Sequence, residues 1–224
     1  GRYGLTPDEP APRSLDAVGH KHGVTRERIR QVENDALDAL SSVLAQSCLK
    51  PVQNVFVSFL RRHAGVADAS DLVPLRRRAE LAGFNPPAVL NLLCDLRGVP
   101  VTRRGNSFLL LDSALATRCE QRLHSVLHSL KKPQSIDEMA EQIAPLLPSV
   151  PNEARQAIVR RLLEDIPHVC ATEDGRYFLF SRGAACLLAD ILRRHADPLH
   201  FRRMTREFNT AVRPDHRRGI GHVL

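Results

Sequence analysis

Tryptophan is absent from this 224-residue sequence, and aromatic residues make up only 4% of it. Cores built without large rings must rely on Leu, Val, Ile and Ala, which favours small helical domains over a large β-sandwich. Long apolar runs are also missing. None approaches the roughly 20 residues that span a bilayer, and no basic start followed by an apolar stretch marks a signal peptide. These absences predict a cytoplasmic protein with no membrane segment.

Cysteine pairs and catalytic signatures are missing as well. The five cysteines lie far apart with no C-x-x-C pair, as expected for reduced thiols in a cytosolic protein. There is no G-x-x-x-x-G-K-[ST] phosphate loop, no H-E-x-x-H, no G-x-S-x-G and no dinucleotide fingerprint. His124 and His128 have a metal-ligand spacing, but no Cys or carboxylate is placed to complete a site. We therefore expect no enzyme, no metal site and no cofactor.

Basic residues are in excess. The 32 Lys and Arg against 25 Asp and Glu give a net charge of +7, and such a balance is compatible with nucleic acid, because each cation that neutralises a phosphate releases a counterion. Much of the excess lies near the C-terminus, where residues 193–218 hold eight arginines and three carboxylates. A second basic stretch contains Lys21, Arg26, Arg28 and Arg30.

Residues 14–40 have the pattern of two helices joined by a tight turn. Ser14 is a good N-cap for the first helix, Gly23 permits the left-handed turn that stops it, and Thr25 is the N-cap of the second. Apolar residues of the second helix recur at three and four residues and are expected to face a core: Ile29, Val32, Ala36, Leu37 and Leu40. The opposite face carries long polar side chains that suit base edges in a major groove. We therefore expect a helix-turn-helix in residues 1–48.

Three runs in this part of the chain resemble region four of the housekeeping-type bacterial sigma factors. They are Arg2-Tyr-Gly-Leu, Ser14-Leu-Asp-Ala-Val-Gly and Gly23-Val-Thr-Arg-Glu-Arg-Ile-Arg-Gln-Val-Glu. In that family the second helix reads the upstream promoter hexamer. The resemblance implies that the residues that touch bases are Arg26, Glu27, Arg30 and Gln31, and that Thr25 and Arg28 lie near phosphates. The alternative is a helix pair kept only as a packing unit, with its charges solvated.

The resemblance covers only the first part of the chain. In the family, further helices precede Arg-Tyr-Gly-Leu, so we expect the beginning of such a region to be missing here. No segment resembles the sigma region that melts promoter DNA and holds the main contact with core polymerase. A complete sigma factor is therefore not expected.

The rest of the sequence is repetitive. Asn85–Leu96 aligns with Asn152–Leu163, and at the same spacing Val99-Pro100 aligns with Ile166-Pro167. Each is followed by a hairpin pattern around a turn pair, Gly105-Asn106 and Asp174-Gly175. Two helical patterns precede each copy: Val52–His63 with Asp71–Leu81, and Leu115–Leu130 with Ser135–Leu147. Three helices and a hairpin predict winged helices at residues 51–112 and 114–181.

A partial third copy is expected at residues 183–224. Leu60-Arg-Arg-His63 recurs as Leu192-Arg-Arg-His195, and the third helix of this copy would begin at Asp215. The stretch 192–209 resembles, more loosely, the HARE-HTH modules related to the polymerase delta subunit. If the three copies are equivalent, buried core positions are expected at Leu60, Leu127 and Leu192.

The copies differ in how well they suit DNA. The third helix of the first copy, Asn85–Leu96, has no Lys or Arg and favours packing or a protein contact. In the second copy, the arginines that either face a nucleic acid or are simply solvated are Arg155, Arg160 and Arg161. The wing tip at Arg103-Arg104 either enters a minor groove or is an ordinary exposed turn. In the third copy, candidate contacts to DNA or RNA are Arg213, His216, Arg217 and Arg218.

Together these patterns predict a mainly α fold with small β-hairpins, in which a helix-turn-helix is followed by tandem winged-helix modules. The predicted function is sequence-selective binding of double-stranded DNA in bacterial transcription regulation. Its DNA-binding residues are predicted to be Thr25, Arg26, Glu27, Arg28, Arg30, Gln31, Arg213, Arg217 and Arg218. RNA polymerase or another protein is a candidate partner of the winged helices. The alternative function is a protein-interaction scaffold, or the DNA-sensing arm of a larger assembly such as an antiviral or DNA-processing machine.

Overall fold

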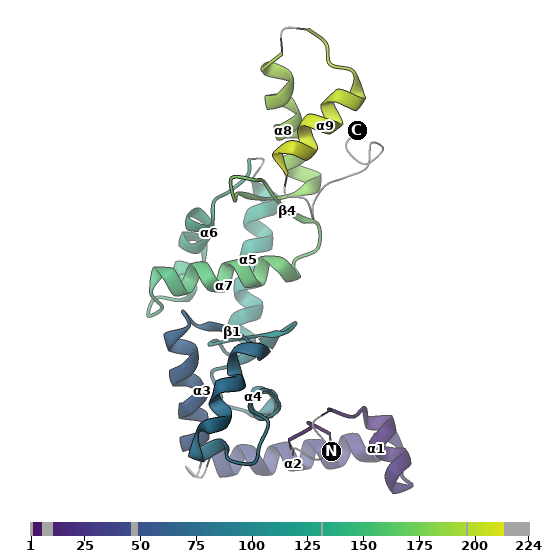
Figure 1. The fold of residues 1–224 in the computed structure, drawn as a ribbon, viewed down its shortest axis with the longest axis vertical. Helices are drawn as coiled ribbons and strands as arrows, with labels where there is room; N and C mark the ends of the chain where they lie inside the picture. Colours follow the sequence, from purple (N-terminus) through teal and green to yellow (C-terminus); the bar gives the residue numbers. More distant parts are fainter. Residues whose placement is uncertain (1, 6–10, 46–48, 131, 196, 213–224) are drawn as a thin grey trace. The chain divides into compact units, whose positions relative to one another are not determined.

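The computed structural model describes residues 2–5, 11–45, 49–130, 132–195 and 197–212. This part of the chain is mainly helical, with small antiparallel strand pairs (Figure 1). It divides into two compact units, Gly1–Ala116 and Thr117–Leu224. Among the described helices, none has the length and apolar character that crossing a membrane requires.

The first unit starts with two helices that pack against each other, α1 (Leu15–His22) and α2 (Arg26–Ala45). Then follow α3 (Lys50–Arg62), β1 (Val66–Asp68), the 3-10 helices η1 (Ala69–Arg77) and η2 (Ala79–Leu81), α4 (Pro86–Asp95), β2 (Thr102–Arg104) and β3 (Ser107–Leu109). The strands form an antiparallel sheet in the order β1-β3-β2. One core joins these elements, and its largest buried side chains include Phe56, Leu60, Leu72, Leu90 and Phe108.

The expected hairpin around Gly105-Asn106 is confirmed. Arg104 pairs with Ser107 across the two-residue turn, and Gly105 has the positive φ of 55° that such a turn requires. β1 was not predicted from the sequence, and it pairs with the far side of β3. A three-residue strand is too short to show an alternating pattern, so only its pairing reveals it.

The helix expected at Asp71–Leu81 has the right position and the wrong type. The chain there forms η1 and η2, which Arg78 separates in an extended conformation. Pro74 lies inside η1 and has no N–H to donate, which disfavours a continuous α-helix. These two short 3-10 helices form a corner of the chain, and η2 contacts α3.

The second unit begins within α5 (Ser113–Ser129), whose first residues still belong to the first unit. It continues with α6 (Ile136–Ile143), η3 (Ala144–Leu146), α7 (Asn152–Asp165), β4 (Val169–Ala171), β5 (Tyr177–Leu179), α8 (Phe180–Arg193) and α9 (Phe201–Ala211). β4 and β5 form the expected antiparallel pair, and Gln134 adds an isolated bridge to Tyr177. The helix predicted at Ser135–Leu147 begins with a capping box. The Ser135 hydroxyl accepts a hydrogen bond from the Glu138 N–H, and the Glu138 carboxylate accepts one from the Ser135 N–H.

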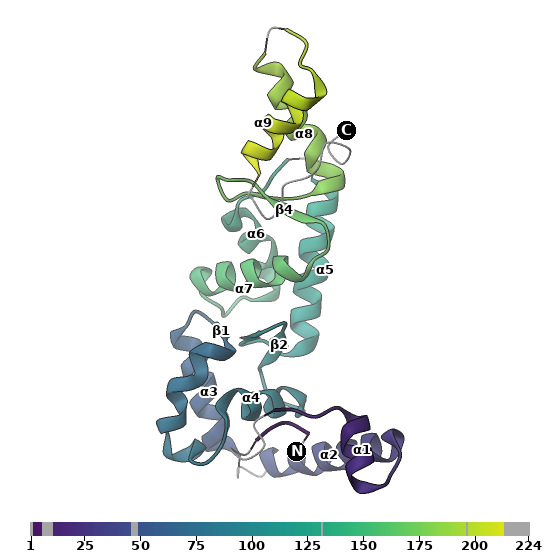
Figure 2. The ribbon, with the colours of Figure 1, turned by 45° about the vertical axis from the view of Figure 1, so that its right-hand side comes forward.

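α8 and α9 lie side by side and pack on the β4–β5 pair, as the views in Figures 1 and 2 agree. Phe208 of α9 and Ile191 of α8 are buried in this cluster, together with Phe178 of β5. The cluster corrects one expectation about the repeat. Leu60 and Leu127 are buried as predicted, but Leu192 is 45% exposed. The buried face of α8 passes through Ile191, and the next residue along a helix points about 100° away. The prediction for Leu192 was therefore wrong by one position.

Candidate nucleic-acid interface

The turn between α1 and α2 has the capping predicted from the sequence. The Ser14 hydroxyl accepts a hydrogen bond from the Ala17 N–H at 3.1 Å, and Gly23 ends α1 in the left-handed conformation, with φ 66°. The Thr25 hydroxyl accepts from the Arg28 N–H at 3.2 Å, which caps the start of α2. Local hydrogen bonds thus stabilise the start of both helices and the left-handed end of α1, and together they fix the geometry of the turn.

Gly19 allows α1 to approach the turn closely. It is a buried residue of α1, and a Cβ atom placed on it would lie 2.7 Å from the Val24 carbonyl oxygen. The Val24 N–H donates to the Gly19 carbonyl at 3.0 Å. Backbone therefore packs directly on backbone here, and this contact sets the position of α2 relative to α1.

The first turns of α2 present five long polar side chains to solvent: Arg26, Glu27, Arg28, Arg30 and Gln31. Arg30 donates two hydrogen bonds to the Glu27 carboxylate, at 2.9 and 2.7 Å. This contact with Arg30 lowers the pKa of Glu27, and Glu27 in turn raises the pKa of Arg30. Arg28 reaches Gln31 at 3.4 Å. Within the described part of the chain, the Arg26 side chain has no hydrogen bond or ion pair, although its charge helps to lower the pKa of Glu27.

The N-terminal segment fastens this helix pair to α4. Tyr3 donates to the Asp95 carboxylate at 2.8 Å, and the Asn85 N–H donates to the Leu5 carbonyl at 3.0 Å. Arg2 pairs with Glu33 of α2 at 2.9 Å. Burial, with the hydrogen bond to Asp95, raises the pKa of Tyr3. The contact between Tyr3 and Asp95 could not be predicted from the sequence, because the two residues lie 92 positions apart and only the fold brings them together.

α4 is therefore engaged within its own unit. It carries no Lys or Arg, and it supplies Asn85 and Asp95 at its two ends to the N-terminal segment. The tip of the β2–β3 hairpin is held by contacts within the unit, since Arg103 donates to the Gly105 carbonyl at 2.8 Å and to Asn91 at 3.0 Å. These contacts favour the interpretation of the tip as an ordinary turn.

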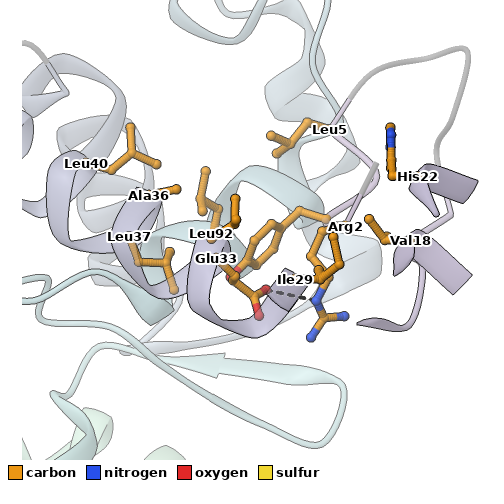
Figure 3. Close-up of a pocket in the computed structure, with 12 residues that line it drawn as sticks. Arg2, Leu5, Val18, His22, Ile29, Glu33, Ala36, Leu37, Leu40 and Leu92 are labelled. Atoms are coloured by element: carbon orange, nitrogen blue, oxygen red, sulfur yellow. Dashed lines mark hydrogen bonds and ion pairs between the residues drawn. The ribbon is translucent and has the colours of Figure 1, made fainter. Parts of the chain in front are cut away.

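An apolar groove of about 480 Å³ runs beside the helix pair (Figure 3). Side chains that line it from α1 and α2 include Val18, Ile29, Val32, Ala36, Leu37 and Leu40. The expectation that all the apolar positions of α2 face a core is only partly met. Leu37 and Leu40 pack against the core of the unit, whereas Val32 is 48% exposed and Ala36 is exposed.

The cations of α7 do not form a common outward face. Arg161 is only 8% exposed and pairs with Glu164 and Asp165, at 2.9 and 3.2 Å. Arg155 is half-buried and donates to the Val150 carbonyl at 2.9 Å. Arg160 is exposed. The expectation of three outward arginines was therefore wrong for two of them, because neighbouring carboxylates and carbonyl groups hold them inward.

α8 and α9 carry a basic surface of their own. Its exposed arginines are Arg193, Arg194, Arg202, Arg203 and Arg206. Glu207 accepts from Arg203 at 3.2 Å and lies 2.8 Å from the His195 ring. The hydrogen bond with His195 lowers the pKa of Glu207, and Arg203 adds to this effect. The C-terminal candidates Arg213, His216, Arg217 and Arg218 lie outside the described residues.

The histidine pair on α5 shows no metal geometry. His124 and His128 are exposed, with ring centroids 6.3 Å apart. In the part of the chain that the structure covers, no group of three or more His, Cys, Asp or Glu is placed to hold a metal ion.

Comparison with known proteins adds no identification. No family model matches the sequence, and no significant match was found among curated proteins or solved structures. The resemblances to sigma region four and to winged helices rest on the residues alone.

Proposed function

We propose that this protein binds double-stranded DNA sequence-selectively in transcription regulation, with the start of α2 in the major groove. The observation that carries the proposal is the exposure of five long polar side chains on the first turns of α2, next to a turn whose caps are all in place. A second helix with donors and acceptors at its N-terminal end is the part of a helix-turn-helix that reads base edges.

The side chains suit two kinds of contact. Arg26 is free to donate to guanine, and Gln31 can bond to adenine. Glu27 and Arg30 are paired with each other, but exposed ion pairs stabilise little, so either can exchange its partner for a base. Thr25 and Arg28 would lie near the phosphates that fix the register of the helix.

The rest of the fold supports the assignment of tandem winged helices. In residues 51–112 the order is helix, strand, helical corner, helix and hairpin, and in residues 114–181 the Gln134 bridge takes the place of β1. α8 and α9 would be the first two helices of a third, partial copy. Their exposed arginines, with the C-terminal cluster, would add affinity that does not depend on sequence.

The proposal is tested with the full chain and a duplex site selected from a randomised pool. Arg26→Ala and Gln31→Ala should each cost about 1–3 kcal/mol of binding free energy on the selected site, and much less on random duplex. Arg160→Ala is the matched control, because it removes an exposed helical cation from the second unit. Fluorescence anisotropy measures both affinities. Equal losses on both DNAs would show that these side chains contact only phosphate.

A second candidate function is a protein-interaction arm, and one observation favours it. The apolar groove beside α1 and α2 leaves Val32 half-exposed, which a protein surface could cover. If no duplex is enriched from the pool, this candidate replaces the first.

A further inference from the structure

A second groove, of about 370 Å³, lies along α3 in the first unit. One stripe of the helix forms its floor: Pro51, Asn54, Val55, Ser58, Phe59 and Arg62. The corner between η1 and η2 forms the opposite wall with Leu75, Arg78 and Glu80. The stripe repeats every three or four residues and extends for roughly 16 Å at 1.5 Å per residue. The groove is therefore an elongated channel.

Its charge is mainly positive. Arg62 is exposed, and no hydrogen bond or ion pair of its side chain is found among the described residues. Arg78 pairs with Glu80 at 3.2 Å, although its own side chain stays 56% exposed. Arg61, Arg76 and Arg77 are exposed beside it on the same two elements. Two arginines and one carboxylate thus line the groove itself, and the other three arginines lie outside its lining.

The remaining wall groups are suited to an oxyanion. Asn54 and Ser58 are exposed and can donate hydrogen bonds from α3. The half-buried Phe59 ring stacks on His63, with centroids 4.0 Å apart and planes at 23°. Guanidinium groups, small donors and an aromatic face in one channel are the combination with which proteins follow a nucleic-acid strand. The exposed Glu80 carboxylate also lines the groove and accepts a hydrogen bond from Arg78.

We propose that this groove binds the phosphate backbone of a nucleic-acid strand through Arg62 and Arg78, with Asn54 and Ser58 as additional donors. The inference rests on the proposed function for the identity of the ligand. It goes beyond that function by assigning the nucleic-acid contact of residues 51–112 to α3 and the η1–η2 corner, since α4 is occupied by the N-terminal segment. Because Glu80 pairs with Arg78, it competes with the phosphate for this guanidinium and so weakens the affinity of the groove for the strand.

The test measures binding of the full chain to a short single strand and to a duplex without the selected site. Arg62→Gln and Arg78→Gln should each remove about one phosphate contact. The ratio of affinities between about 50 and 200 mM salt should then fall about threefold for each variant, from a slope of roughly 0.7–0.9 per phosphate. Arg77→Gln is the control for lost net charge, because Arg77 is exposed but does not line the groove. Glu80→Gln should have the opposite effect and raise affinity.

Inorganic phosphate gives an independent measurement. Titration followed by NMR should shift the amide signals of Asn54, Ser58 and Arg62 in the wild type and much less in Arg62→Gln. Circular dichroism confirms that each variant is folded.

Equal salt dependence for the groove variants and Arg77→Gln would overturn the inference, and so would binding of a short poly-Glu peptide in preference to the oligonucleotide. The proposed function fails separately, through loss of the effect of Arg26→Ala on the selected site. If Arg26→Ala still weakens binding to the selected site while Arg62→Gln and Arg78→Gln leave the salt dependence unchanged, only the proposal for the groove is refuted.

Discussion

Gly19 offers the sharpest test of the α1–α2 geometry, because Gly19→Ala alters no charge and no side chain that could reach DNA. In an ordinary helix the change from Gly to Ala stabilises by about 1 kcal/mol. Here the new Cβ would lie 2.7 Å from the Val24 carbonyl oxygen, which is backbone and cannot move without displacing the turn. Overpacking of this kind costs about 1–3 kcal/mol. With the helical gain subtracted, we expect a net loss of up to about 2 kcal/mol, and a fall in Tm of roughly 4–8 °C for each kcal/mol lost.

The assay combines thermal melting, followed by circular dichroism, with anisotropy on the selected duplex. Sequence-selective affinity should fall, because α1 can no longer hold α2 in place, while binding to random duplex changes little. Gly183→Ala is the matched control. Its Cβ would lie 2.6 Å from the Phe178 Cβ, so it should destabilise the second unit and spare base preference. A Gly19→Ala protein with an unchanged or higher Tm and unchanged selectivity would refute the reasoning.

Three further predictions concern the rest of the chain. Leu60→Ala should cost about 2–5 kcal/mol of unfolding free energy in chemical denaturation, whereas the exposed Leu192→Ala should cost well under 1 kcal/mol; equal costs would contradict the burial. Replacing Arg213, Arg217 and Arg218 together with Ala should lower the salt slope of duplex binding by about 2–3 and leave base preference unchanged; an identical slope would exclude this cluster as a DNA surface. Because the pKa of Glu207 is lowered in the fold, its contribution to the packing of α8 on α9 is present above the usual carboxyl pKa and is lost as the pH falls through the lowered value. Glu207→Gln should remove that part of the acid dependence, measured by amide exchange in α9; acid loosening identical to the wild type would argue against it.

The features that sequence reasoning predicted well depend on neighbouring residues. Ser14, Gly23 and Thr25 act within one helical turn of their own positions, and the capping of α1 and α2 follows from their side chains and backbone freedom. The same holds for the Gly105-Asn106 turn. Exposure of the polar face of α2 also follows from the helical period, so most of the candidate site could be anticipated.

Features that depend on distant residues could not be predicted in this way. Arg161 was expected to face outward, but the packing of α7 buries it beside Glu164 and Asp165. The repeat of Leu-Arg-Arg-His suggested a buried Leu192, yet the rotation of α8 against its neighbours selects Ile191 instead.

The sequence by itself determined the mainly helical composition, the caps and turns of the helix pair, the hairpins and the concentration of arginines. Only the tertiary structure decided that Tyr3 meets Asp95, that α4 is thereby engaged, and that a basic groove opens along α3. The physical reason is the range of the interactions. Helix caps, turn conformations and amphipathic periods are properties of a few consecutive residues. The rotation of a helix and the partner of a side chain depend on which distant surfaces pack together, and that follows from the whole chain.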